Sequence, residues 1–175
     1  MKYLILISAL FLSSCATNPQ RALNHLRPPL DTLPGPVKLR QQLSIKSEKL
    51  NQSFEAVLSY DEKVLKVVAL TTMGSILFSM EYDGKQLKSS NPKMQKLAQL
   101  VLSDILLATM KPEDLSKQLP EALEVLDKDQ LRSVLNRGDE LVKVSYIEKK
   151  AWPREFVLVR ISQGYELKVR TLEEL

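Results

Sequence analysis

Apolar and polar positions alternate along the first half of the chain, which is the pattern of strands with one covered face. The alternation is clearest in SFEAVLSY and in SILFSMEY. Turn-forming pairs such as Asp61-Glu62 and Asp83-Gly84 separate consecutive segments, which predicts hairpins. We therefore expect an antiparallel meander of four or five strands, at residues 38–47, 53–60, 63–71, 75–82 and, for the short fifth, 85–89.

The apolar period changes from two to about 3.6 after residue 90, which predicts a long helix over residues 90–110. Asn91 is suited to cap this helix, and Pro92 to occupy its first position. The second half of the helix is apolar nearly all round, so it is expected to be buried or to line an apolar space. Asp104 interrupts this surface, and we expect it on the solvent edge.

The last third of the chain returns to the alternation of strands. A short helix is predicted to begin at Pro112 and to end before Pro120. Two hairpins follow, in residues 129–148 and 154–173, with turns at Arg137-Gly138-Asp139 and Gln163-Gly164. About nine antiparallel strands curl strongly. The predicted fold class is therefore mainly antiparallel β with helices, an open and incomplete barrel covered by one long and one or two short helices.

The chain opens with MKYLILISALFLSSCATN, which has the pattern of a secretory signal peptide: a basic Lys2 and an apolar run too short to span a bilayer. LSSC, which ends in Cys15, resembles a bacterial lipobox, whose cysteine is acylated and becomes the first residue of the mature protein. The alternative is an ordinary signal peptide with a chance cysteine. Ala16 stands where an aspartate would signal retention in the inner membrane. We therefore expect a lipid-anchored protein on the periplasmic face of the outer membrane.

These segments divide the chain into a signal peptide at residues 1–14, the lipidated Cys15 with a proline-rich linker at 15–36, and one domain at 37–175. Proline-rich chain extends at about 3 Å per residue, so such a linker could hold the domain well away from the membrane. His25, the only histidine, lies in this linker and is expected to be solvated. Alternatively, part of the linker packs on the domain through its leucines, which are Leu23, Leu26, Leu30 and Leu33.

The composition argues against the common catalytic classes. Apart from His25 and Cys15 the chain holds no histidine or cysteine, which excludes Ser-His-acid and Cys-His catalysis and a His/Cys zinc site in the domain. The net charge of +4 comes from scattered residues, and an exported chain meets no nucleic acid. We expect no enzyme, no catalytic residue, no metal and no cofactor beyond the lipid on Cys15. A carboxylate-only hydrolase stays open through the acidic pairs, which are Glu113-Asp114, Asp127-Asp129 and Glu173-Glu174.

The apolar faces of the strands and the long helix would meet inside such a barrel. They form either an ordinary filled core or a cavity for acyl chains, because ligand pockets are mostly apolar and often lie in the mouths of barrels. The candidate cavity residues are Phe54, Leu58, Tyr60, Val67, Ile76, Phe78, Met80, Leu97, Val101 and Ile105.

Three segments carry a resemblance to the Lol family of lipoprotein carriers, and within it to the outer-membrane receptor LolB. They are LTTMGS, DILLATMKPEDL and WPREFVLVRISQGYELKVRTLE, and the likeness spans most of residues 38–172. The chain also resembles, more closely, a group of bacterial lipoproteins linked with aryl-polyene lipid pathways. The resemblance implies an eleven-stranded open barrel, so that about nine to eleven strands are expected, and helices that cover a cavity for acyl chains. It also implies that Met73, in a hairpin turn, contacts the membrane.

The leading functional hypothesis is a monomeric lipoprotein that binds the acyl chains of a lipid or lipoprotein and assists its delivery to the outer membrane. A periplasmic LolA-like carrier is its expected protein partner. The alternative is a structural accessory lipoprotein with a filled core, which docks onto an envelope assembly or a glycolipid or aryl-polyene export complex.

Overall fold

The computed structural model describes residues 18–71 and 73–175, so the predicted signal peptide and Cys15 lie outside the described residues. The described chain forms one antiparallel sheet of ten strands in the order β5-β4-β3-β2-β1-β10-β9-β8-β7-β6. The strands are β1 (Val37–Lys46), β2 (Asn51–Tyr60), β3 (Leu65–Leu70), β4 (Ile76–Tyr82), β5 (Leu87–Ser89), β6 (Leu123–Lys128), β7 (Leu131–Asn136), β8 (Asp139–Tyr146), β9 (Glu155–Arg160) and β10 (Tyr165–Glu174). Because β5 and β6 stand at the two edges, the sheet is an open, incomplete barrel, as predicted.

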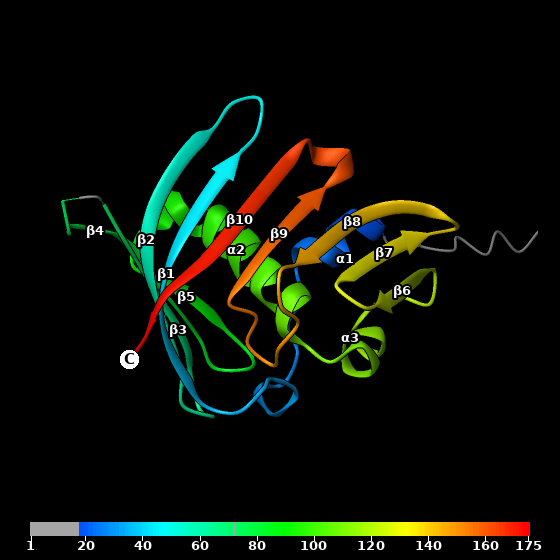
Figure 1. Cartoon of the computed structure of the whole chain (residues 1–175), viewed down its shortest axis with the longest axis horizontal. Coiled ribbons are helices and arrows are strands. Elements are labelled where there is room, and N and C mark those ends of the chain that lie inside the picture. The colour runs from blue at the N-terminus through cyan, green and yellow to red at the C-terminus, as the bar shows by residue number, and fades with distance from the viewer. Residues whose placement is uncertain (1–17, 72) are drawn as a thin grey trace, which may run out of the picture.

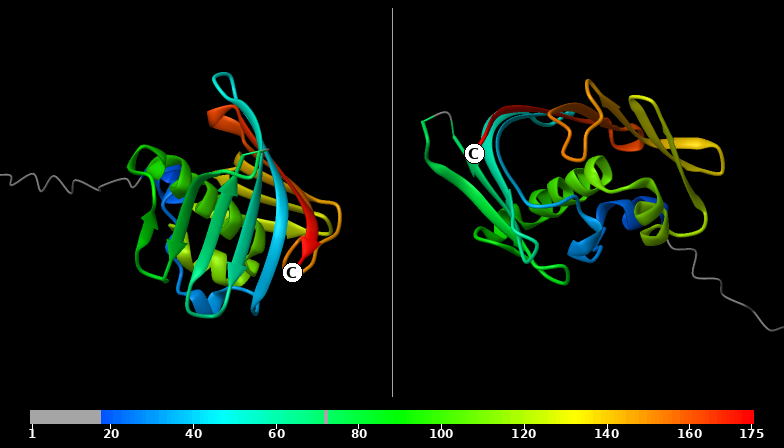
Figure 2. Two further views of the ribbon diagram at one scale, coloured as in Figure 1. Left: turned by 90° about the vertical axis from the view of Figure 1, so that its left-hand side faces the viewer. Right: turned by 60° about the horizontal axis from the view of Figure 1, so that its bottom comes forward.

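The sheet curls around its helices (Figures 1 and 2). The helices are α1 (Pro19–Asn24), α2 (Gln95–Thr109) and α3 (Pro112–Gln118), with short 3-10 turns η1 (Leu30–Thr32), η2 (Pro92–Met94) and η3 (Ile161–Gln163). Figure 2 shows α2 lying along the concave side of the sheet. Among the described helices, none combines the length and apolarity needed to cross a bilayer.

Local sequence places both ends of α2. The side chain of Asn91 accepts a hydrogen bond from the backbone N–H of Lys93, and this capped turn leads directly into the helix. At the other end, the chain becomes extended at Met110, shortly before Pro112. The carbonyl of Leu107 accepts a hydrogen bond from buried Arg132 at 2.6 Å, which satisfies one free acceptor and places a cation at the helix C-terminus.

The edge strand β6 was not predicted, since no strand was expected between the short helix and residue 129. Its alternation is weak, because Leu126 on the outer face is apolar and 40% exposed whereas Asp127 faces inward. Asp127 is tolerated there because it pairs with Arg132 of β7 at 2.9 Å and with Lys149. The pattern of one apolar face therefore failed at a strand whose inner face carries an ion pair.

Residues 18–36 of the predicted linker are part of the folded domain. All four of its leucines are buried, and Leu23 has no exposed surface. Asn18 caps α1 by accepting from the backbone N–H of Gln20, and Pro19 stands in the first helical turn. The alternative in which the linker packs through its leucines is thus what the structure shows, and this segment does not act as an extended spacer.

Candidate functional site

Residues 23–33, here called the N-terminal strap, cross the concave side of the sheet beside α2. Tyrosines of strands β2 and β4 donate hydrogen bonds to its backbone carbonyls. The Tyr82 hydroxyl of β4 donates to Pro28 at 2.6 Å, and the Tyr60 hydroxyl of β2 donates to Leu30 at 2.7 Å. Three of its eleven residues belong to η1 and two to α1, so side chains of the sheet supply much of the hydrogen bonding that holds it.

Both tyrosines remain donors over the physiological pH range. Burial raises the pKa of Tyr82 to about 12 and also raises that of Tyr60 above its ordinary value. A neutral phenol donates one hydrogen bond, and a buried carbonyl that loses its donor destabilises the fold. The strap is therefore held by a small number of identifiable bonds.

The predicted cavity residues mostly lie together inside the barrel. Eight of the ten are buried: Phe54, Leu58, Tyr60, Val67, Phe78, Met80, Val101 and Ile105. Leu97 is half-buried against the same core. Ile76 is not in the interior, since it is 67% exposed at the start of β4. A β-bulge lies between the pairs Ala69–Phe78 and Leu70–Ile76, so strict alternation, which placed Ile76 on the inner face with Phe78, fails at this position.

Side chains of the chain itself fill this interior. One internal space lies between α2, β1, β9 and β10, beneath Trp152, and it measures about 10 Å³. Such a volume holds about one water molecule and no acyl chain. The four strap leucines belong to the same continuous cluster as the apolar faces of the strands and α2. An acyl chain would thus have to displace side chains, and the strap is the segment with the least regular structure around them.

The largest departure from expectation is Asp104, which has no exposed surface and is not on the solvent edge. Its Oδ1 accepts from Arg160 of β9 through Nε at 2.8 Å and Nη2 at 2.6 Å. The same guanidinium donates to Asn24 Oδ1 at 2.8 Å and, at 3.4 Å, to the carbonyl of Leu23. Arg160 therefore joins the sheet, α2 and the start of the strap. Burial raises the pKa of Asp104 to about 6, while Arg160 acts in the opposite direction.

The turn between β3 and β4 presents an exposed apolar tip, formed by Met73, Ile76 and Leu77. Their exposed fractions are 91%, 67% and 40%. Gly74, with φ of +79°, donates its N–H to the Thr71 carbonyl at 2.9 Å and so closes the turn. The tip occupies the same end of the strands as η3, because β1 pairs with both β2 and β10 in antiparallel register. Its membrane contact stays a prediction.

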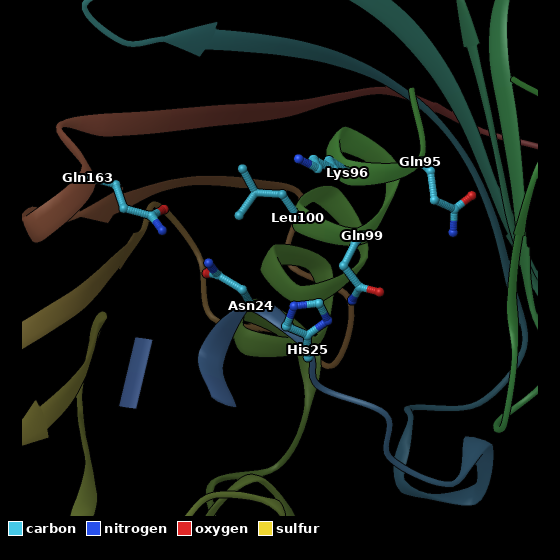
Figure 3. A pocket seen from close by; sticks show the side chains of 7 residues that line it. All are labelled: Asn24, His25, Gln95, Lys96, Gln99, Leu100 and Gln163. Atoms are coloured by element: carbon cyan, nitrogen blue, oxygen red, sulfur yellow. The ribbon is translucent and has the colours of Figure 1, made fainter. Parts of the chain in front are cut away.

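An open pocket of about 480 Å³ lies where α1, the first turns of α2 and η3 meet. In Figure 3 the side chains of Gln163 and Leu100 face each other, with Asn24 below them and Lys96 above. Gln95 and Gln99 extend from the other flank of α2. His25 lines the same pocket and is exposed, as expected for this residue. This pocket could not be predicted from the sequence, because its residues come from three distant segments.

The strap had a signal in the sequence, since its leucines recur at intervals of three and four. The ion pair had no signal in the sequence, because the apolar pattern does not show that Arg160, on the inner face of β9, would meet Asp104.

Within the described residues, no group of three or more His, Cys, Asp and Glu side chains could hold a metal ion. The acidic pairs do not converge either: Asp127 is bound to Arg132 and Lys149, and Asp114 to Lys117.

An open antiparallel sheet curled around a central helix, with an apolar concave face, defines the structural class of this protein. The chain belongs to the family described as "Protein of unknown function (DUF3261)", which matches residues 38–173. No match is found among curated proteins.

Two solved structures are similar in overall arrangement. One is described as an outer membrane lipoprotein-sorting protein domain from Vibrio parahaemolyticus, with a TM-score of 0.40 and 9% identity over 81% of this chain and 85% of that one. The other is a LolA superfamily protein from Nitrosomonas europaea, with a TM-score of 0.42 and 9% identity over 91% and 93%. Likenesses of this size do not define a function.

Removing the two strap bonds should loosen the strap while leaving the sheet folded. In the Tyr60→Phe, Tyr82→Phe double variant we expect amide hydrogen exchange in residues 23–33 to be about 30-fold faster, since each bond contributes about 1 kcal/mol. The matched control is Tyr146→Phe, whose hydroxyl donates at 2.9 Å to Ala108 in α2 and not to the strap. Equal acceleration in the control and the double variant would contradict this account of the strap.

Proposed function

We propose that this protein is a non-enzymatic lipoprotein that binds acyl chains of a lipid or lipoprotein between its sheet and α2, and assists their delivery to the outer membrane. The observation that carries the proposal is the apolar concave face, covered in part by the strap. The strap leucines present to the sheet the kind of surface that an acyl chain presents. An acyl chain that replaces them would keep the apolar face away from water. This burial is favourable by about 25 cal/mol for each Å² of apolar surface.

The anchor on Cys15 is part of the proposal. Two residues separate Cys15 from Asn18, where the described chain begins, so that stretch spans at most about 11 Å. The Gln20 Oε1 accepts from Ser162 of η3 at 2.8 Å, so the chain enters the fold at this end of the sheet. An acylated Cys15 would therefore hold the domain at the bilayer surface, where the apolar tip at Met73 can reach lipid.

The finer assignments follow the resemblance seen in the sequence. We propose that the protein acts as an acceptor like LolB, that it works with a periplasmic LolA-like carrier, and that its cargo belongs to a pathway such as aryl-polyene lipid export. The direction proposed is from the periplasm to the outer membrane. The exposed apolar tip supports this proposal, since an exposed Met73 and Ile76 would be able to enter a bilayer during transfer.

A filled interior favours a second candidate, the structural accessory lipoprotein. The internal space beside Trp152 measures only about 10 Å³, and the buried side chains of the strap, the sheet and α2 form one continuous cluster. In that case the apolar tip or a sheet edge would dock onto a membrane complex. Purification of the lipidated protein from its own envelope with one stoichiometric protein partner, together with the absence of acyl binding, would favour this candidate over the first.

Titration with a fluorescent fatty acid tests the proposed function. The chain from Ala16 onward keeps every described element and should bind the probe saturably at one site. Leu107→Ala, which removes a fully buried side chain of α2, should increase the affinity by leaving a cavity. The control Leu126→Ala, on the outer face of β6, should bind like the unchanged chain. Absence of saturable binding in both the unchanged chain and Leu107→Ala would reject acyl binding.

A further inference from the structure

The pocket between α1, the first turns of α2 and η3 presents hydrogen-bond donors. Its seven described lining residues include Lys96 and His25 but no aspartate or glutamate. Its volume of about 480 Å³ lies in the range of small-molecule sites. The Lys96 ammonium supplies three donors, and each amide in the lining supplies two.

The hydrogen bonds behind the pocket fix the orientation of two of these amides. Asn24 Oδ1 accepts from Arg160 at 2.8 Å and from Gln20 Nε2 at 3.2 Å. Gln99 Oε1 accepts from Arg27, and Gln99 Nε2 donates to Ser103 Oγ at 3.4 Å within α2. Because arginine can only donate, both amide oxygens are turned away to meet it. The Nδ2 donors of Asn24 are left without an acceptor among the described residues, at the wall of the pocket.

We propose that this pocket binds a phosphate group. A phosphate offers several acceptor oxygens and a negative charge, which matches a lining that holds the Lys96 cation, the Nδ2 donors of Asn24 and no acid. The half-buried Leu100 adds an apolar wall, so the phosphate of a lipid headgroup and free phosphate are both chemically suitable. The site lies beside α1, close to where the chain leads to Cys15. Asn24 and His25 belong to the strap, but phosphate binding does not require the strap to move, so a failure of acyl binding would leave this proposal standing.

His25 gives this proposal a direct reporter, since a chain without a histidine tag shows one histidine signal. The chain from Ala16 is titrated with inorganic phosphate at constant ionic strength and pH, and the imidazole resonances are followed by NMR. We expect a saturable shift. Lys96→Ala should weaken phosphate binding about tenfold, the change that corresponds to the loss of one charged hydrogen bond. The control Lys93→Ala removes an exposed lysine three residues away that does not line the pocket, and it should bind normally.

Asn24→Asp provides a second variant that retains the contact with Arg160 but places a carboxylate at the pocket wall. It should abolish the phosphate-induced shift while the far-UV circular dichroism is unchanged. Vesicles of phosphatidylcholine with and without phosphatidylglycerol separate the two sources. If the His25 shift depends on Lys96 only with the anionic vesicles, the ligand is a lipid headgroup. If it depends on Lys96 only with inorganic phosphate, the ligand is the free anion. No saturable shift with either probe, or equal losses in Lys93→Ala and Lys96→Ala, would overturn the proposal.

Discussion

Replacing Arg160 with methionine is expected to lower the free energy of unfolding by about 3–5 kcal/mol at pH 8. The guanidinium and Asp104 have no exposed surface, and the pair links β9, α2 and the strap. Methionine fills much of the same volume but leaves the Asp104 carboxylate buried without a cation. Urea unfolding of the chain from Ala16, followed by circular dichroism, measures the loss.

This loss should depend on pH, because the charged form of Asp104 is what becomes uncompensated. Burial raises the pKa of Asp104 to about 6, above its ordinary value of 3.8. The folded state therefore holds this proton more tightly than the unfolded chain, and the contribution of Asp104 to stability grows as pH falls from about 6 toward about 4. Without Arg160 the pKa rises further, so the destabilisation in Arg160→Met should be largest at pH 8 and smaller at pH 5.

The Asp104→Leu, Arg160→Met double variant separates the cost of an unpaired charge from the loss of packing. Replacing a buried ion pair by apolar side chains is often neutral or stabilising, so the double variant should recover most of the stability lost in Arg160→Met at pH 8. Equal losses at pH 5 and pH 8, or a double variant no more stable than the single one, would show that the ion pair does not determine the effect.

Much of the fold could be predicted because strand and helix periodicity survive wherever one face is covered by apolar side chains. The antiparallel meander, the long helix at α2 and the final hairpins follow from such positions. β6 was missed because its inner face uses Asp127, paired with Arg132, where an apolar side chain was expected. The strap was open to two readings, since its prolines indicate a linker while the spacing of its leucines indicates packing.

In the candidate site too, periodicity predicts which side chains are buried but not how they pack or pair. The residues expected to line the interior do meet there, apart from Ile76, because alternation determines which face of a strand is buried. Alternation cannot tell whether that interior is hollow or filled, since this depends on how the side chains of facing elements interlock. The Arg160–Asp104 pair and the Lys96 pocket depend on residues more than fifty positions apart coming together, and only the folded chain shows such a meeting.

The exposed apolar tip should contribute to membrane contact independently of the anchor. Met73→Glu, Ile76→Glu is expected to weaken binding of the chain from Ala16 to phosphatidylethanolamine–phosphatidylglycerol vesicles by about 100-fold. Two apolar side chains that insert partially account for about 3 kcal/mol, and both residues are exposed, so the fold should be unaffected. Flotation of the protein with the vesicles measures the partitioning.

Ile147→Glu is the matched control for this tip. Ile147 is also 67% exposed but follows β8 at the opposite end of the strands, since Tyr146 pairs with Phe156 whereas Val142 pairs with Arg160, next to η3. It should bind vesicles like the unchanged chain.

The lipidated protein carrying Met73→Glu tests the tip in the proposed function. This variant should still bind the acyl probe but deliver cargo poorly. The lipid anchor keeps the protein on the membrane, but it does not replace the proposed contact of the tip with lipid. If Met73→Glu fully restores function in cells that lack the protein, Met73 is only a turn residue. If Ile147→Glu weakens vesicle binding as much as Met73→Glu, Ile76→Glu, any exposed apolar residue contributes and the tip has no special role.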